Sequence, residues 1–165
     1  MQKIKILSTG LLLMAFAACG NNQSASSTKD TTAATTAVAP QSANSFTVEA
    51  NDSMKFSVTS LTATAGSPIT ITLKNVGKLP KAAMGHDLVV LKSGTNVDTY
   101  AQAAAQAQAT DYIPSSQAAN IVAHTKLLGP GESDTITFTL QPGTYDYICS
   151  FPGHYASMRG KLTVQ

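Results

Sequence analysis

The sequence predicts an all-β protein that folds as a β-sandwich with one short inserted helix. Three observations support this prediction. From Phe46 onward, apolar and polar residues alternate with a period of two, as in strands with one buried face. The alternating runs are short and are separated by turn signals such as "NVGKLP", "GPGES" and "QPG". Residues 98–110 lack this period and are rich in Ala and Gln instead.

The strands are taken in chain order. In "SFTVEA" Phe46 and Val48 alternate with polar neighbours, and "PITITLKN" and "DTITFTLQ" repeat the pattern. Between these runs Asp98 opens "DTYAQAAAQAQAT" as an N-cap, so that residues 98–110 are predicted to form a helix on the flank of the sandwich, the alternative being a mobile insertion. The remaining strand candidates are "MKFSVTSL", "HDLVVLK", "NIVAHTK", "GTYDYICS" and "GKLTVQ".

The N-terminal segment is typical of an export signal. A basic "MQKIK" precedes an apolar "ILSTGLLLMAFAA", so residues 1–18 are predicted to be a signal peptide. The junction "FAACG" resembles the lipobox of bacterial lipoproteins, which implies lipidation of Cys19; an ordinary secretory signal cleaved nearby is the alternative. Residues 19–45 hold little that a core could bury and are predicted to be a lipid-attached flexible linker. The third segment, residues 46–165, is the folded domain.

The net charge excludes some partners. The chain has a formal charge of +2, and removing Lys3 and Lys5 with the signal leaves nine basic against nine acidic residues. This balance predicts no nucleic-acid partner, and it predicts membrane contact only through the N-terminal lipid.

A metal-ligand cluster is predicted in "CSFPGHYASM", which contains Cys149, His154 and Met158. Nine extended residues would separate Cys149 from Met158 by about 30 Å, but "PG" at 152–153 reverses the chain between them. Strand parity points Cys149 inward, and it also points His86 into the same end of the core. Two imidazoles, one thiolate and a weak methionine form the ligand set of blue-copper sites.

Packing alone would be the usual explanation of a single His, Met or Cys, but the joint spacing favours a ligand site. His124 is interpreted as an ordinary surface histidine. A disulfide between Cys19 and Cys149 would remove both from their predicted roles, so none is expected.

The stretches "ANDSMKF", "LPKAAMGHDLVVL", "IVAHTKLLGPGES" and "TYDYICSFPGHYASMRGKLTV" resemble, in this order, those of the azurins, which are bacterial cupredoxins. The resemblance implies an eight-stranded Greek-key sandwich, so residues 46–165 are expected to be a cupredoxin domain. It also implies one copper ion, cycling between Cu(I) and Cu(II), in a plane of His86, Cys149 and His154. Met158 and the Gly85 carbonyl are implied as weak axial ligands.

The resemblance further implies an apolar collar around an exposed edge of the His154 ring, suited to brief docking of redox proteins such as cytochromes, a reductase or an oxidase. Asp87 stands where the azurins have an asparagine that braces the ligand loop. Its carboxylate is expected to accept hydrogen bonds from Ser150 and to lower the reduction potential. The expected collar residues are Met54, Leu79, Met84, Phe151, Pro152 and Ala156.

The function predicted from these features is electron transfer by a monomeric blue-copper protein, anchored by lipid in the periplasm or elsewhere in the cell envelope. No enzymatic activity is expected, because five ligands leave the metal no open position for a substrate. The alternative is a periplasmic protein for copper storage or delivery, although the chain lacks the Met-rich or His-rich tracts typical of copper shuttling. A nitrite-reductase-like enzyme would require a second domain, for which the chain is too short.

Overall fold

The computed structural model describes residues 44–165, which contain nine strands and two α-helices. Among these residues no helix is long and apolar enough to cross a membrane. The predicted signal peptide, Cys19 and nearly all of the predicted linker lie outside the described residues. The elements are β1 (Ser45–Asn51), β2 (Lys55–Phe56), β3 (Ser60–Ala63), β4 (Ile69–Asn75), α1 (Lys81–Met84), β5 (Val89–Leu91), α2 (Val97–Ala105), β6 (Ile121–His124), β7 (Ser133–Phe138), β8 (Gly143–Ile148) and β9 (Arg159–Val164).

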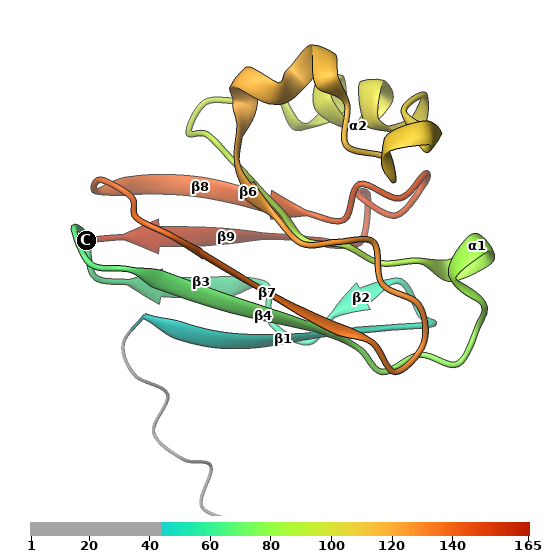
Figure 1. Cartoon of the computed structure of the whole chain (residues 1–165). Coiled ribbons are helices and arrows are strands. Elements are labelled where there is room, and N and C mark those ends of the chain that lie inside the picture. The colour runs from blue at the N-terminus through green and yellow to red at the C-terminus, as the bar shows by residue number, and fades with distance from the viewer. Residues whose placement is uncertain (1–43) are drawn as a thin grey trace, which may run out of the picture. The chain divides into compact units, whose positions relative to one another are not determined.

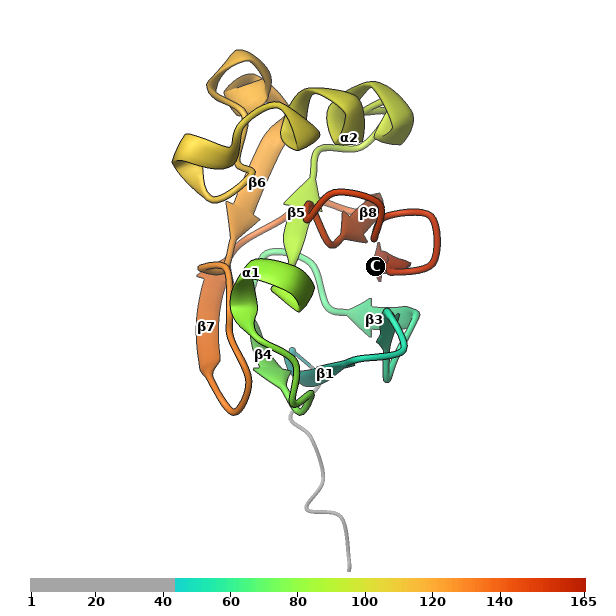
Figure 2. The same ribbon diagram turned by 90° about the vertical axis from the view of Figure 1, so that its right-hand side faces the viewer.

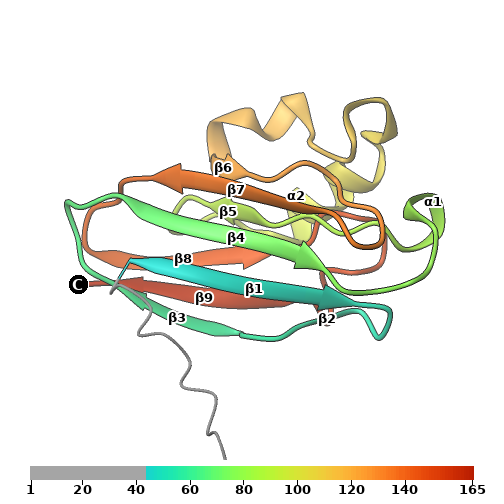
Figure 3. The same cartoon turned by 60° about the horizontal axis from the view of Figure 1, so that its bottom comes forward.

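The strands form two sheets that face each other (Figure 1). One sheet has the order β2-β1-β4-β7 and the other has the order β3-β9-β8-β5-β6. Figure 3 shows β1, β4 and β7 side by side in front of β3, β9 and β8. Two pairs are parallel, β1 with β4 and β3 with β9, and the others are antiparallel. The all-β sandwich prediction is therefore confirmed.

The main core lies between the sheets, where the period-two pattern places its apolar side chains. Ile69, Ile71 and Leu73 of β4 are fully buried, and the intervening threonines Thr70 and Thr72 are half-buried on the outer face. These threonines bond across the sheet to Thr137 and Thr135 of β7 through their hydroxyls. The period of two in the sequence thus gives β4 one buried apolar face and one polar outer face.

A second, smaller core lies on the outer face of the five-stranded sheet, beneath α2 (Figure 1). Val89 and Leu91 point to this side of β5, whereas Leu88 and Val90 belong to the main core. From α2, Tyr100 and Ala104 are buried against them at helical spacing. The "VVL" run of β5 is therefore continuously apolar because both of its faces are covered.

The structure differs from the sequence predictions in three local respects. The predicted helix 98–110 ends at Ala105, and Asn96 rather than Asp98 caps it by accepting a hydrogen bond from the Thr99 N–H at 2.9 Å. The short helix α1 was not predicted. Nine strands replace eight, because the candidate "MKFSVTSL" divides between the two sheets: β2 pairs with β1, and β3 pairs with β9.

Candidate metal centre

The ligand loop, residues 149–158, connects β8 to β9 at one end of the sandwich (Figure 2). The two strands pair up to Ile148 and Arg159, and the Cys149 N–H then donates to the Met158 carbonyl at 3.0 Å. Cys149 and Met158 therefore lie opposite each other as the pairing ends. Between them a turn with Gly153 at φ 82° reverses the chain, a backbone conformation that glycine adopts without strain.

His86 is brought to the same end by the segment that leads into β5. The His86 N–H donates to the Leu128 carbonyl at 3.1 Å, and the Leu128 N–H donates to the His86 carbonyl at 2.7 Å. Two residues later the Leu88 N–H donates to the hydroxyl of Thr125 at 3.0 Å. These bonds to the β6–β7 connection hold His86 in register with the buried Leu88, as its strand parity predicts.

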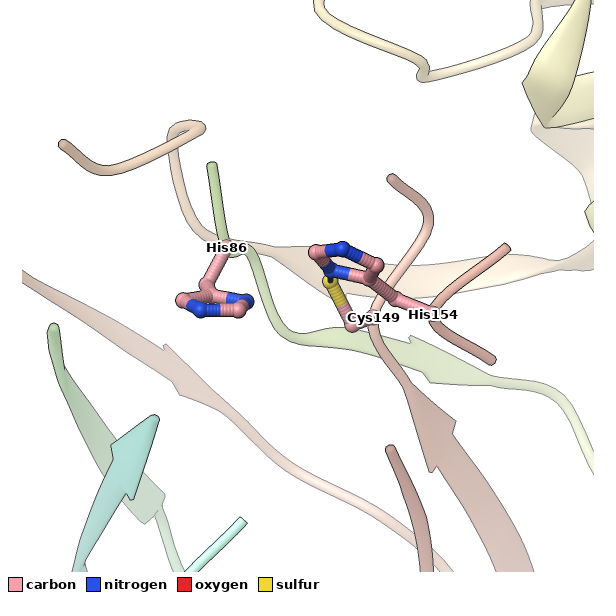
Figure 4. Close-up of side chains that lie close together, drawn as sticks. All are labelled: His86, Cys149 and His154. Atoms are coloured by element: carbon pink, nitrogen blue, oxygen red, sulfur yellow. Dashed lines mark hydrogen bonds between the residues drawn. The ribbon is translucent and has the colours of Figure 1, made fainter. Parts of the chain in front are cut away.

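Three side chains converge where these segments meet (Figure 4). Ligand atoms of His86, Cys149 and His154 all lie within 4.8 Å of one another. The Cys149 Sγ is 3.6 Å from His154 Nδ1, and the centroids of the two imidazole rings are 5.0 Å apart. His86 and Cys149 are fully buried, and both His86 ring nitrogens lack a hydrogen-bond partner among the described residues.

Such a cluster fits a soft or borderline transition metal. Unpartnered polar nitrogens are costly in a protein interior, and a metal ion would satisfy them. Two imidazoles with one thiolate select copper or zinc over the hard cations that prefer oxygen. The three residues predicted from spacing and parity do come together.

Comparison with known proteins decides between these metals. Residues 42–165 match the copper-binding proteins of the plastocyanin/azurin family. The chain belongs to the plastocyanin/azurin family.

Two relatives, one named as an outer membrane protein and one as an azurin, show how similar this chain is to other proteins. It is 43% identical over 122 residues to "Outer membrane protein H.8" of Neisseria gonorrhoeae, covering 72% of this chain and 66% of that protein. It is 39% identical over 121 residues to "Azurin-2" of Alcaligenes xylosoxydans xylosoxydans, covering 70% of this chain and 93% of that protein.

A solved structure confirms the cupredoxin fold. Dithionite-reduced auracyanin from the photosynthetic bacterium Roseiflexus castenholzii superposes with a TM-score of 0.67 at 35% identity. The match covers 74% of this chain and 97% of the auracyanin chain. The cofactor of this azurin-like cupredoxin is copper, and the cluster of His86, Cys149 and His154 suits it.

Burial controls the protonation of the copper-free cluster. Burial raises the pKa of the Cys149 thiol well above its ordinary value, the nearby Asp87 adds to this, and hydrogen bonds from backbone N–H groups oppose it only in part. Burial also lowers the pKa of His154 to about 4, with His86 as a second cause. The pKa of His86 is lowered by burial, against the opposing effects of the Asn51 carbonyl and Asp52. Both imidazoles are therefore neutral at pH 7 and able to bind a metal.

Asp87 lies directly behind the ligand loop and is fully buried. Its carboxylate accepts a hydrogen bond from the Ser150 N–H at 2.6 Å and a second, short one from the Ser150 hydroxyl. Burial raises the pKa of Asp87 to about 6, although these hydrogen bonds act to lower it. The contact between Asp87 and Ser150 is the one expected from the sequence, and it fixes the residue that follows Cys149.

The two expected axial positions lie close to the cluster. The Met158 side chain is fully buried in the main core, and its backbone carbonyl bonds to Cys149. Gly85 directly precedes His86, and a Cβ added there would lie 2.8 Å from the Lys81 carbonyl and 3.1 Å from the Leu127 side chain. This close approach explains why the position carries glycine.

The predicted collar residues differ in how exposed they are. Met54 and Leu79 are 38% and 45% exposed, and the Ser157 hydroxyl ties the loop to the Met54 carbonyl at 2.9 Å. The ring of Phe151 packs on that of His154 with centroids 4.6 Å apart. His154 is only 3% exposed, less than the exposed imidazole edge expected, because Phe151 and the loop cover it. Of the other collar residues Met84 is half-buried, and Pro152 and Ala156 are exposed.

Two contacts near the site were not anticipated. The Asp52 carboxylate accepts hydrogen bonds from the Lys78 N–H at 2.8 Å and from the Leu79 N–H at 3.4 Å, and so holds the loop that presents Leu79. The "ND" pair at 51–52 is a turn signal that could have indicated such a role. Thr125, which orients the segment after His86, carries no comparable sequence signal.

Proposed function

We propose that this blue-copper electron-transfer protein carries single electrons between redox partners in the bacterial cell envelope. The burial of all three ligands of the cluster, His86, Cys149 and His154, supports this function most directly. When bound there, copper supplies a one-electron couple between Cu(I) and Cu(II). A buried cluster held by two paired strands and a braced loop keeps its donors nearly fixed while the charge changes, as rapid electron transfer requires.

The residues of the proposed centre have separate roles. Cys149, His86 and His154 would hold the copper strongly and Met158 and the Gly85 carbonyl would bind it weakly, a division that the family resemblance suggests. The Ser150 N–H and hydroxyl neutralise part of the charge of Asp87, which in turn orients the start of the loop. No catalytic residue belongs to this proposal.

The decisive experiment is to add Cu(II) to the purified protein and record its visible spectrum. We expect one equivalent of copper to produce the intense blue band of a Cu(II)–thiolate site. Cys149→Ser is expected to remove the band, whereas Met158→Leu, which alters only a weak ligand, retains it. A copper complex of the native protein that is nearly colourless, with only weak visible absorption, would refute the blue-copper assignment.

The alternative function, copper storage or delivery, predicts ready loss of the metal. Because the three ligands are buried, we expect copper to remain bound through repeated reduction and oxidation in the presence of a copper chelator. Rapid transfer of the ion to the chelator would favour delivery instead. The measurement is the retention of the blue band after each cycle.

The collar, which comprises Met54, Leu79, Met84, Phe151, Pro152 and Ala156, is proposed as the docking surface for a cytochrome, reductase or oxidase. Exposed apolar side chains suit brief contacts that bury little area. We expect Leu79→Glu to slow electron exchange with a c-type cytochrome. Ser93→Glu, in the exposed turn that follows β5, is the matched control and is expected to have no effect.

The location proposed for the protein is the periplasmic side of an envelope membrane, with Cys19 acylated and the folded domain monomeric. The relative named "Outer membrane protein H.8" supports an envelope location. Mass spectrometry of the mature N-terminus tests the anchor and is expected to find a lipid on Cys19. Cys19→Ser should abolish the lipid and release the protein from membranes. A mature N-terminus at another residue without lipid would contradict it.

A further inference from the structure

Three aromatic rings form a continuous row that begins at the metal centre. The His154 and Phe151 rings pack at a centroid distance of 4.6 Å with planes at 37°. Beyond Phe151, the ring of Tyr112 meets it edge to face at 5.1 Å and 67°. Tyr112 belongs to the segment after α2, far in sequence from the ligand loop. Edge-to-face pairs at these separations are attractive and have a defined geometry.

The Phe151 ring is only partly enclosed by the main core, so its contact with Tyr112 contributes to holding it in place. Its carbonyl accepts the His154 N–H at 3.0 Å, which sets the backbone of the loop but not the side chain. The side chain is half-buried at the margin of the main core. It also lines an open cleft of about 370 Å³ together with Lys81, Leu127 and Tyr112. This cleft offers Phe151 room to turn away from His154 unless the Tyr112 ring blocks it.

The backbone of Tyr112 is held in an unusual conformation. Asp111 and Tyr112 have φ values of 50° and 64°, so two consecutive non-glycine residues are left-handed. The Tyr112 N–H donates to the Ala107 carbonyl at 2.9 Å, and the Thr110 hydroxyl bonds to the carbonyls of Ala107 and Ile113. Such backbone strain persists where the surrounding structure over-determines it, and it is concentrated near functional sites.

We propose that Tyr112 is a positioning residue for His154 and acts through Phe151. The strained turn presents the Tyr112 ring, the ring holds Phe151 against the imidazole, and the imidazole keeps Nδ1 directed at Cys149, 3.6 Å away. This proposal rests on the proposed function, in which a fixed ligand geometry is what the centre requires. It adds a residue from outside the ligand loop to those that fix that geometry.

The experiment compares Tyr112→Leu with Tyr112→Phe in the copper-free protein at pH 7. Nuclear Overhauser effects between the Phe151 and His154 rings, and the ¹⁵N shifts of the His154 imidazole, report the ring positions without any metal. We expect Tyr112→Leu to lose the ring-to-ring effect and shift the imidazole signals. Tyr112→Phe retains the aromatic edge and is expected to preserve both.

Ile113→Ala is the matched control. Ile113 is the next residue of the same turn and is also half-buried, but it packs against the second core beneath α2. A general loosening of the turn would affect His154 in this variant as well. In the copper-loaded proteins we expect the reduction potential to change in the non-aromatic variants of Tyr112 and to stay unchanged in Tyr112→Phe and Ile113→Ala. Tyr112→Met serves as a second non-aromatic variant if the leucine variant fails to fold.

Three outcomes overturn the proposal: unchanged ring signals in the non-aromatic variant that folds, equal changes in that variant and in Tyr112→Phe, or an Ile113→Ala effect as large as that of the non-aromatic variant. The copper-free readings depend on ring packing alone. They therefore separate a failure of this proposal from a failure of the electron-transfer function, which the copper spectrum tests.

Discussion

Replacing the buried Asp87 with asparagine should remove a pH-dependent contribution to stability. Folding raises the pKa of this carboxyl from 3.8 to about 6 through burial. Between these pH values the folded protein holds a proton on Asp87 that the unfolded chain has released, so the unfolding free energy falls as pH rises through this window. The shift corresponds to about 3 kcal/mol of stability lost between pH 3.8 and pH 6.

Asp87→Asn carries no such proton. Its amide oxygen can still accept the Ser150 N–H, and its amide group can bond with the Ser150 hydroxyl. We therefore expect the variant to gain about 3 kcal/mol relative to the native protein between pH 3.5 and pH 7.5. Subtracting one protein from the other cancels the titration of His86 and His154, which both proteins share.

The assay is urea unfolding of both copper-free proteins across this pH range, followed by circular dichroism because the chain has no tryptophan. Asp111→Asn serves as the control, since Asp111 is exposed and asparagine tolerates its left-handed backbone. A difference in unfolding free energy that stays constant with pH, or that moves in favour of the native protein, would refute the reasoning.

Other predictions concern the histidines and the packing around Tyr147. Folding lowers the pKa of His154 from 6.5 to about 4, so the copper-free protein should lose about 3 kcal/mol as pH falls through that window, and a urea series on His154→Gln should lack this loss. Tyr147→Phe removes a hydrogen bond from the hydroxyl to the Val58 carbonyl at 2.7 Å and should cost about 1 kcal/mol in urea unfolding; an unchanged midpoint would argue against that bond. Gly160→Ala places a Cβ 2.2 Å from the Tyr147 ring and 2.6 Å from the Thr59 carbonyl, so it should lower the melting temperature more than Tyr147→Phe does, and an equal or higher value would contradict this close packing.

The fold and the three ligands were predictable from local patterns. Period-two alternation assigns each residue to a face, and the same parity directs Cys149 and His86 into the core. A Pro-Gly turn lies between Cys149 and His154. It predicts a reversal of the chain that does not depend on the surrounding structure. These features depend on residues close in sequence, so the sequence alone carries them.

What could not be predicted depends on distant partners. The division of "MKFSVTSL" into β2 and β3 is decided by β1 and β9, each of which pairs with a different half of the segment. Asn96 and Asp98 are both good helix caps, and local preference does not distinguish them; in the structure α2 begins at Val97, directly after Asn96. The contact of Tyr112 with Phe151 arises from a left-handed turn of two non-glycine residues, which sequence patterns rarely indicate.

The position of the last strand has a consequence for the order in which the protein can fold. Strand β9 lies between β3 and β8, and its pairing joins Ser60 to Lys161. The five-stranded sheet therefore cannot close until the C-terminal residues have been synthesised. Contacts so distant in sequence slow folding, because a long loop must be closed before they form. The chain therefore lacks its completed sheet, and lacks Met158 opposite Cys149, until β9 has joined β3 and β8.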